Sequence, residues 1–228
     1  MYENIIVIPF RQRNTHLEYF IKNTIPLLQK YLPNSKVVVI EQAEGKLFNR
    51  GMLLNVGFKQ YENKTKYFFT NDVDINPTKK CIEEYYTKEV SDREVLGIYT
   101  SHCNTLGGII KIKNNTIHKI NGFPNNIWGW GTEDKALQNR TEYYNIKKLT
   151  NFTSKMKHPL YFLLFNDVND RKTKNLLYNT NNQYNKFKTF NNEKKLQEIM
   201  SSGLNNLKYT ILEQKMIHDM VELIKIKI

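Results

Sequence analysis

The run Lys66-Tyr67-Phe68-Phe69-Thr70-Asn71-Asp72-Val73-Asp74 decides the fold that this sequence predicts. Its aromatic first part is typical of a buried strand, and it ends in two carboxylates. Two apolar runs before it, at residues 5–8 and 36–41, predict strands as well. Helical spacing over residues 16–31 and 53–61 separates the three runs. Strands that alternate with helices indicate an α/β fold with a mainly parallel sheet.

Predicted strands and helices continue after residue 74, but they alternate less regularly. Residues 96–99, 108–113 and 208–212 predict further strands, and residues 133–140 predict a helix. Residues 218–228 alternate isoleucine with lysine near their end, which is typical of an edge strand guarded by charge. The chain has 228 residues and no linker-like segment, so we expect a single domain spanning 1–228.

Composition limits the class of protein and its location. No run of about 18 apolar residues occurs, so no transmembrane helix is expected. The N-terminus lacks the basic start and cleavage site of a signal peptide, and Cys81 and Cys103 form no disulfide framework. These features predict a cytoplasmic protein. The formal net charge of +12 is spread along the chain, which argues against nucleic acid as the main partner and suits an anionic small substrate.

Polar residues follow each of the first three predicted strands, at Arg11–Arg13, Phe48–Arg50 and Asp72–Asp74. Ligands of parallel sheets bind beyond the carboxyl ends of the strands, so we expect these groups to converge there. Paired carboxylates suit Mg²⁺ or Mn²⁺, and guanidinium groups bind phosphate in a bidentate manner. The alternative is that the aspartates form turns and the arginines are solvated surface residues.

Residues 120–134 hold the only two tryptophans, which alternate with glycines and lead into an acidic pair: Trp128-Gly129-Trp130-Gly131-Thr132-Glu133-Asp134. An indole covers the apolar face of a sugar, and glycines give its backbone freedom to move. A carboxylate in the same segment could accept a hydroxyl proton. The segment therefore predicts a saccharide acceptor site. The alternative is a core tryptophan beside a helix-capping aspartate.

Taken together and in order, these residues resemble the β-1,4-galactosyltransferase family of inverting enzymes. The resemblance is collinear and covers most of the chain: Ile8–Arg13, Phe48–Phe58, Asp72–Asp74, Gly107-Gly108, residues 128–134 and residues 202–207. It implies a single-domain GT-A fold, Rossmann-like, with a mainly parallel sheet and flanking helices. It also implies a metal-dependent enzyme that moves galactose or N-acetylgalactosamine from UDP-Gal or UDP-GalNAc to a saccharide acceptor. The nucleotide-binding half would be about residues 1–80, and the acceptor half about residues 95–228.

The resemblance assigns a role to each residue that matches a family motif. Asp74 would bind Mn²⁺, Asp134 would be the general base, and Glu133 would help Asp134 to hold the acceptor. Phe123 and Gly131 would lie near the sugars, and Trp130 would close over the donor and also contact the acceptor. The remaining donor-binding residues would be Pro9, Phe10, Arg11, Arg13, Phe48, Arg50, Asp72, Val73 and Thr105.

The sequence departs from the family pattern at three points. It lacks the Golgi signal anchor and stem, and it lacks the family's disulfide cysteines, which again predicts a cytoplasmic enzyme. At the metal site, Leu164 and Asp167 align with the family's Met and His ligands. Because leucine cannot ligate, Asp74 and Asp167 would form an all-oxygen site that takes Mn²⁺, with Mg²⁺ as a substitute.

Three other functions compete with this interpretation. A lectin-like module on the same fold would bind sugar without turnover, but the presence of Asp74 and Asp134 argues against it. A basic nucleic-acid-binding protein would show a steep dependence of affinity on salt. A glycan hydrolase would need two carboxylates on opposing segments, whereas Glu133 and Asp134 are adjacent.

Overall fold

A computed structural model describes residues 1–100, 105–129, 131–149, 159–164, 197 and 200–228. Within these residues an eight-stranded sheet runs in the order β7-β5-β6-β3-β1-β2-β10-β9, and β4 pairs with β8 beside it. The strands are β1 (Tyr2–Phe10), β2 (Ser35–Gln42), β3 (Thr65–Thr70), β4 (Ile75–Pro77), β5 (Glu94–Tyr99), β6 (Ile109–Lys113), β7 (Lys147–Leu149), β8 (Phe162–Leu164), β9 (Thr210–His218) and β10 (Val221–Lys227).

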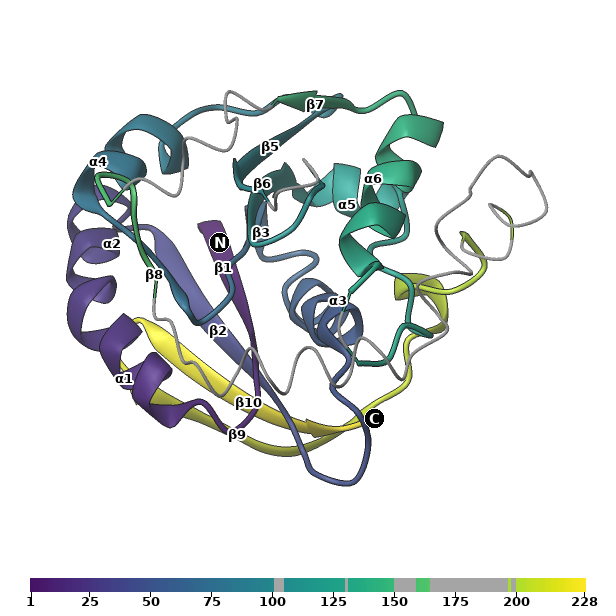
Figure 1. The fold of residues 1–228 in the computed structure, drawn as a ribbon, viewed down its shortest axis with the longest axis horizontal. Helices are drawn as coiled ribbons and strands as arrows, with labels where there is room; N and C mark the ends of the chain where they lie inside the picture. Colours follow the sequence, from purple (N-terminus) through teal and green to yellow (C-terminus); the bar gives the residue numbers. More distant parts are fainter. Residues whose placement is uncertain (101–104, 130, 150–158, 165–196, 198–199) are drawn as a thin grey trace.

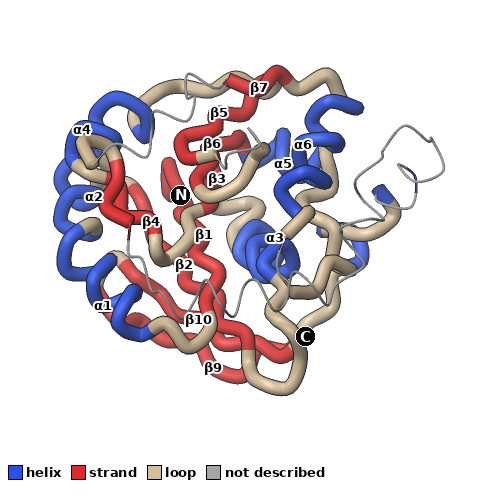
Figure 2. The backbone as a smooth tube through the Cα atoms, viewed as in Figure 1, coloured by secondary structure: helices blue, strands red, loops and turns tan. Residues whose placement is uncertain are grey.

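Helices cover both faces of this sheet (Figure 1). One layer contains α1 (Asn14–Asn23), α2 (Ile25–Tyr31) and α4 (Lys79–Cys81), which a π-helical turn continues (Ile82–Tyr86). The other layer contains α3 (Arg50–Gln60), α5 (Asn114–Lys119) and α6 (Glu133–Tyr143). A 3₁₀ turn (Leu204–Asn206) precedes β9. Figure 2 shows the strands of the eight-stranded sheet between these two groups of helices.

The sheet is mixed but mostly parallel, as the alternation of strands and helices predicts. β1 pairs in parallel with β2 and β3, and β10 pairs in parallel with β2. β6 is antiparallel to both β3 and β5. Strands β1 to β3 run in one direction. Their last residues, Phe10, Gln42 and Thr70, therefore lie at the same edge of the sheet.

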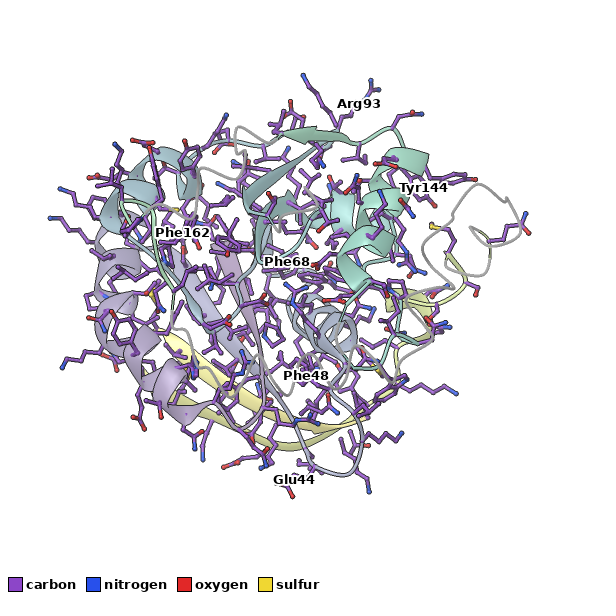
Figure 3. All side chains as sticks on the ribbon, viewed as in Figure 1. Glu44, Phe48, Phe68, Arg93, Tyr144 and Phe162 are labelled. Carbon is purple, nitrogen blue, oxygen red and sulfur yellow. The ribbon has the colours of Figure 1, made fainter. Side chains whose placement is uncertain are left out.

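Each face of the central strands packs against one helical layer. Ile6 and Ile8 of β1 pack with Leu17 and Phe20 of α1, whereas Ile5 and Val7 belong to the core on the α3 side. Phe68 of β3 lies in that second core, in the interior of the molecule (Figure 3). Burial on both faces explains why these strands are continuously apolar rather than alternating.

The structure corrects two of the predicted elements. The helix expected over residues 16–31 is two helices, α1 and α2, which meet at Thr24. Pro26 stands in the first turn of α2, where its missing N–H is tolerated but would interrupt one continuous helix. The strand expected at the edge of the sheet, β10, lies inside it between β2 and β9. Its Lys225 pairs with Glu41 of β2 at 3.2 Å, so β10 has a partner strand where a guarded edge was expected.

Candidate active site

The three polar segments that follow β1, β2 and β3 meet beyond the carboxyl ends of these strands, as the sequence predicts. They are Arg11–Arg13, Phe48–Arg50 and Asp72–Asp74. Pro9 and Phe10 are the last two residues of β1, and both are buried. The loop after β2 leads into α3 at Asn49 and Arg50, and the loop after β3 carries Asp72 and Asp74. Val73 is 2% exposed, so it packs into the core while the aspartates on either side of it remain partly exposed.

Arg50 is the central residue of this cluster. Its Nε donates to Asp72 Oδ1 at 2.7 Å, and its Nη1 donates to Asp134 Oδ1 at 2.9 Å. The same Nη1 lies 3.5 Å from Glu133 Oε1. The Arg50 side chain is 11% exposed. One nearly buried guanidinium therefore joins the end of β3 to the start of α6.

Burial and charge shift the pKa values of this cluster. Burial alone would lower the pKa of Arg50, but the three neighbouring carboxylates raise it, so the guanidinium stays charged. Burial and the neighbouring Asp134 charge raise the pKa of Glu133, against the opposing effect of Arg50. Burial also raises the pKa of Asp134, which Arg50 again opposes. Among the described residues Glu133 Oε2 is buried with no hydrogen-bond partner.

The backbone before α6 explains how the acidic pair reaches Arg50. Gly129 (φ 82°), Gly131 (φ 98°) and Thr132 (φ 77°) have left-handed conformations, which glycine adopts without strain. Glu133 and Asp134 then occupy the first turn of α6, where the helix dipole favours negative charge. Trp130, between the two glycines, lies outside the described residues.

Two glycines flank the same carboxylates from the β6 side. The carbonyl of Gly108 accepts from Arg50 Nη2 at 3.4 Å. A Cβ atom on Gly107 would lie 2.1 Å from Asp134 Oδ2. Asp134 can therefore occupy its position only because residue 107 has no side chain.

Asp74 lies on the outer side of the cluster, where the sequence places a metal ligand. Its Oδ2 is 3.4 Å from Nη1 of Arg13, and its side chain is 21% exposed. Ile75, the next residue, pairs with Leu164 across β4 and β8. The chain after Leu164, including the expected ligand Asp167, lies outside the described residues. Within the described part of the chain no three potential ligands of the His, Cys, Asp or Glu type cluster together.

A loop between β2 and α3 connects the end of β1 with the tryptophan segment. Arg11 Nη1 donates to the carbonyl of Lys46 at 2.7 Å, and its guanidinium lies 5.3 Å from the centroid of the Phe48 ring. Phe48 and Glu44 both belong to this loop, and Figure 3 shows Glu44 at its outer end. The ammonium of Lys46 lies 5.3 Å from the Trp128 ring centroid. Sequence reasoning missed Lys46, because nothing in its neighbourhood points to a distant aromatic ring.

Phe123 lies beneath the cluster rather than at its surface. It is fully buried, and its ring centroid is 6.0 Å from the guanidinium carbon of Arg50. Asn55 holds it on both sides, because Phe123 N–H donates to Asn55 Oδ1 at 2.8 Å and Asn55 Nδ2 donates to Phe123 carbonyl at 2.7 Å. The sequence signal for Asn55 was its position as a polar residue in a helix that is otherwise apolar on that side.

Arg140 is a second residue that sequence reasoning missed. It is fully buried and donates to the carbonyls of Asn121 and Gly122, each at 2.6 Å. It also donates to the carbonyl of Ser202. Arg140 therefore fixes the turn before Phe123 to the turn before the C-terminal strands. Thr105 and Gly131, two further predicted site residues, are both half-buried, and Thr105 follows directly on residues that are not described.

Comparison with known proteins matches this arrangement to one family. The sequence model of the N-terminal region of glycosyl transferase group 7 matches residues 1–87, and that of the N-terminal domain of galactosyltransferase matches residues 94–161. The chain is 38% identical over 149 residues to human β-1,4-galactosyltransferase 4, and 37% identical over 145 residues to bovine β-1,4-galactosyltransferase 1. The chain belongs to the β-1,4-galactosyltransferase family.

These matches cover 62% and 60% of the chain but only 43% and 36% of the two relatives. The chain therefore spans less than half the length of the curated relatives that it matches. The relatives are Golgi-resident type II membrane proteins, so the prediction of a cytoplasmic enzyme is wrong. In the described residues no helix is both long and apolar enough to cross a bilayer.

Solved structures identify the fold as GT-A, as the resemblance implies. A Drosophila β-1,4-galactosyltransferase 7 variant, solved with manganese, UDP-Gal and xylobiose, superposes with a TM-score of 0.76 at 24% identity. The superposition covers 100% of this chain and 94% of that one. A mannosyltransferase from Pyrobaculum calidifontis shares the fold more distantly, with a TM-score of 0.53 over 66% of this chain and 55% of that one.

Proposed function

We propose that this chain is a metal-dependent, inverting glycosyltransferase that moves a hexose from a UDP-sugar to a saccharide acceptor. The observation that carries the proposal is the bridge that Arg50 makes between Asp72 and Asp134. It places a cation suited to a diphosphate directly beside a carboxylate suited to proton removal. The nucleotide would bind in the half formed by about residues 1–80, and the acceptor in the half formed by about residues 95–228.

Asp134 would act as the general base. It would take the proton from an acceptor hydroxyl as that oxygen attacks the anomeric carbon of the donor. UDP would leave from the opposite face, so the configuration at that carbon inverts. Arg50 would stabilise the negative charge that develops on the departing diphosphate. Glu133, whose pKa burial raises, would stay protonated and donate a hydrogen bond to a hydroxyl oxygen of the acceptor sugar, which would hold the acceptor in place.

The donor would be held by residues at the ends of β1 and β2. Arg11 and Arg13 would bind phosphate oxygens, because a guanidinium matches phosphate geometry. Phe48, which stacks against Arg11, would offer its ring to the base. Pro9, Phe10, Asp72 and the backbone of Val73, whose side chain packs into the core, would line the pocket. Trp130 would cover it and contact the acceptor beside Gly131.

A divalent cation fits the acidic end of this site. Asp74 supplies carboxylate oxygens, the ligands that Mn²⁺ and Mg²⁺ prefer, and its side chain is partly exposed. Asp74 would hold the ion together with Asp167, and Mn²⁺ would neutralise charge on the diphosphate when bound. The resemblance implies that Phe123 lies near the sugars, whereas its burial favours a supporting role beneath Arg50.

The test is a donor and metal screen on the purified chain. UDP release would be followed with UDP-Gal and UDP-GalNAc, with Mn²⁺ or Mg²⁺, and with and without simple saccharide acceptors. We expect metal-dependent release that an acceptor accelerates. Asp74→Ala should raise the Mn²⁺ concentration needed, whereas Asp92→Ala, an exposed carboxylate remote from the site, should not. Sugar binding without UDP release under any condition would instead support the lectin-like alternative.

The contact between Gly107 and Asp134 leads to a prediction. Gly107→Ala should lower the transfer rate by about tenfold to a hundredfold, because the new Cβ must displace the Asp134 carboxylate and small misplacements are costly. Rates would be measured for Gly107→Ala, Asp134→Asn and the double variant. Since both changes act through one carboxylate, the double variant should be no slower than Asp134→Asn alone. Additive losses would mean that Gly107 acts elsewhere.

Thr105 leads to a prediction about donor choice. The resemblance implies that the residue two places before Gly107-Gly108 would shape the pocket near C2 of the donor sugar. Threonine leaves room there for an N-acetyl group, so UDP-GalNAc should be used at least as well as UDP-Gal. The two donors would be compared with one acceptor, and Thr105→Tyr should shift preference toward UDP-Gal. A strong preference for UDP-Gal that persists in Thr105→Gly would contradict the prediction.

A further inference from the structure

The strand β9 ends the sheet on the side away from β7, and it is unusually exposed. Figure 1 shows it at the margin of the molecule, outside β10. Among the described residues no strand pairs with its outer edge. Its first seven residues are all exposed, including Ile211 (39%), Leu212 (52%) and Met216 (50%).

Exposed edge strands invite pairing with another chain, and proteins commonly protect them with charge. The charges on β9 do not protect it against a copy of itself. Glu213 and Lys215 lie on the same face of the strand, on either side of Gln214, and form an ion pair of 2.7 Å. If β9 pairs antiparallel with a second β9 about Gln214, each glutamate faces the lysine of the other copy.

The apolar residues of β9 follow the same symmetry. In that register Leu212 would stand opposite Met216, and Ile211 opposite Ile217, where Leu212 and Ile217 lie at the two irregular positions of β9. Opposite charges and apolar side chains that face each other across strands both stabilise an antiparallel pair. The sequence of β9 is therefore complementary to itself about its centre, in charge and in polarity.

Contacts with β10 hold the centre of β9 in place for such pairing. Residues 213–216 pair with β10 in regular register, between two irregular positions. Gln214 Nε2 also donates to Glu222 Oε1 at 3.0 Å, which fixes the centre of β9 to the interior strand. A rigid central segment lowers the entropy that a partner strand must overcome on binding.

We propose that β9 pairs with β9 of a second copy of this chain, forming a twofold dimer whose sheet runs continuously through both copies. In a twofold interface the same surface is used on both sides, as the symmetry about Gln214 requires. This inference does not depend on the proposed activity, because none of the site residues belongs to β9.

The test measures molecular mass by sedimentation velocity across a range of protein concentrations. The wild-type chain should form a concentration-dependent dimer. Glu213→Lys and Lys215→Glu should each raise the dissociation constant by about tenfold or more, because like charges then face each other at two symmetric positions. The double variant Glu213→Lys/Lys215→Glu should restore the dimer, because opposite charges face each other again.

Lys30→Glu, an exposed charge reversal on α2, is the matched control and should leave the dissociation constant unchanged. A chain that stays monomeric at the highest concentration overturns the proposal. A dimer that tolerates both single reversals, or one that the double variant fails to restore, also overturns it, because the contact would then lie on another surface.

Discussion

Replacing Asp134 by asparagine should reduce sugar transfer by about a hundredfold or more, the usual scale for loss of a general base. Asparagine keeps the size and one oxygen of the side chain, so it can still accept from Arg50. Binding of UDP in the presence of Mn²⁺ should therefore remain close to that of the unchanged protein. Transfer rates and UDP affinity would be measured on the same preparation.

Glu142→Gln is the matched control for this variant. Glu142 is an exposed acid on the same helix, α6, and its replacement should leave the transfer rate unchanged.

The transfer rate of the unchanged protein should also rise with pH as Asp134 ionises. Because burial raises the pKa of Asp134, this rise should lie above the pH range of an ordinary carboxyl group. Near-normal turnover in Asp134→Asn would remove Asp134 from the mechanism.

Replacing Arg50 by methionine should produce the largest loss of stability. The change leaves Asp72, Glu133 and Asp134 without their common cation, and breaking a buried ion pair in this way costs about 3–5 kcal/mol. Transfer should be lost as well, because no cation would then face the diphosphate. The free energy of unfolding would be measured by chemical denaturation, and Arg50→Lys serves as the control that keeps the charge but not the planar fork.

The loss in Arg50→Met should depend on pH. Without the cation, burial raises the pKa of Glu133 and Asp134 further above the values of the unfolded chain. When a carboxyl group has a higher pKa in the folded chain than in the unfolded chain, the free energy of unfolding falls as pH rises from the unfolded pKa through the folded pKa. The destabilisation should thus be smaller in acid than at neutral pH. Equal losses at both pH values would mean that Arg50 acts through packing alone.

The sequence predicts the central strands well and the C-terminal strands poorly, for a physical reason. Strands β1 to β3 are buried on both faces, so their apolar runs are continuous and unambiguous. In β10, lysines alternate with isoleucines as they do at an edge, although its Lys225 pairs with Glu41 of β2. Local pattern does not show which distant strand will supply the partner of a charge.

The same limit applies to the site. Arg50, Asp72 and Asp134 stand in recognisable motifs, and the structure brings all three together. Arg140 donates instead to backbone carbonyls, and Asn55 binds both the backbone N–H and the backbone carbonyl of Phe123. These backbone groups belong to residues far away in the chain, and they leave no trace in a sequence. The need for a glycine at position 107 likewise depends on where Asp134 lies after folding.

The place of β10 in the sheet has a consequence for biosynthesis. Its register joins Val221 to Val37, so one edge of β2 remains unpaired until the ribosome has made residue 221 and those after it in β10. Pairing between such distant segments is slow, because a long loop must close before the contact forms. The nascent chain will thus expose this edge of the apolar strand β2 until β10 has been synthesised. Shielding by a chaperone matters most in that interval, and a ribosome that stalls before residue 221 leaves a product that cannot complete its core.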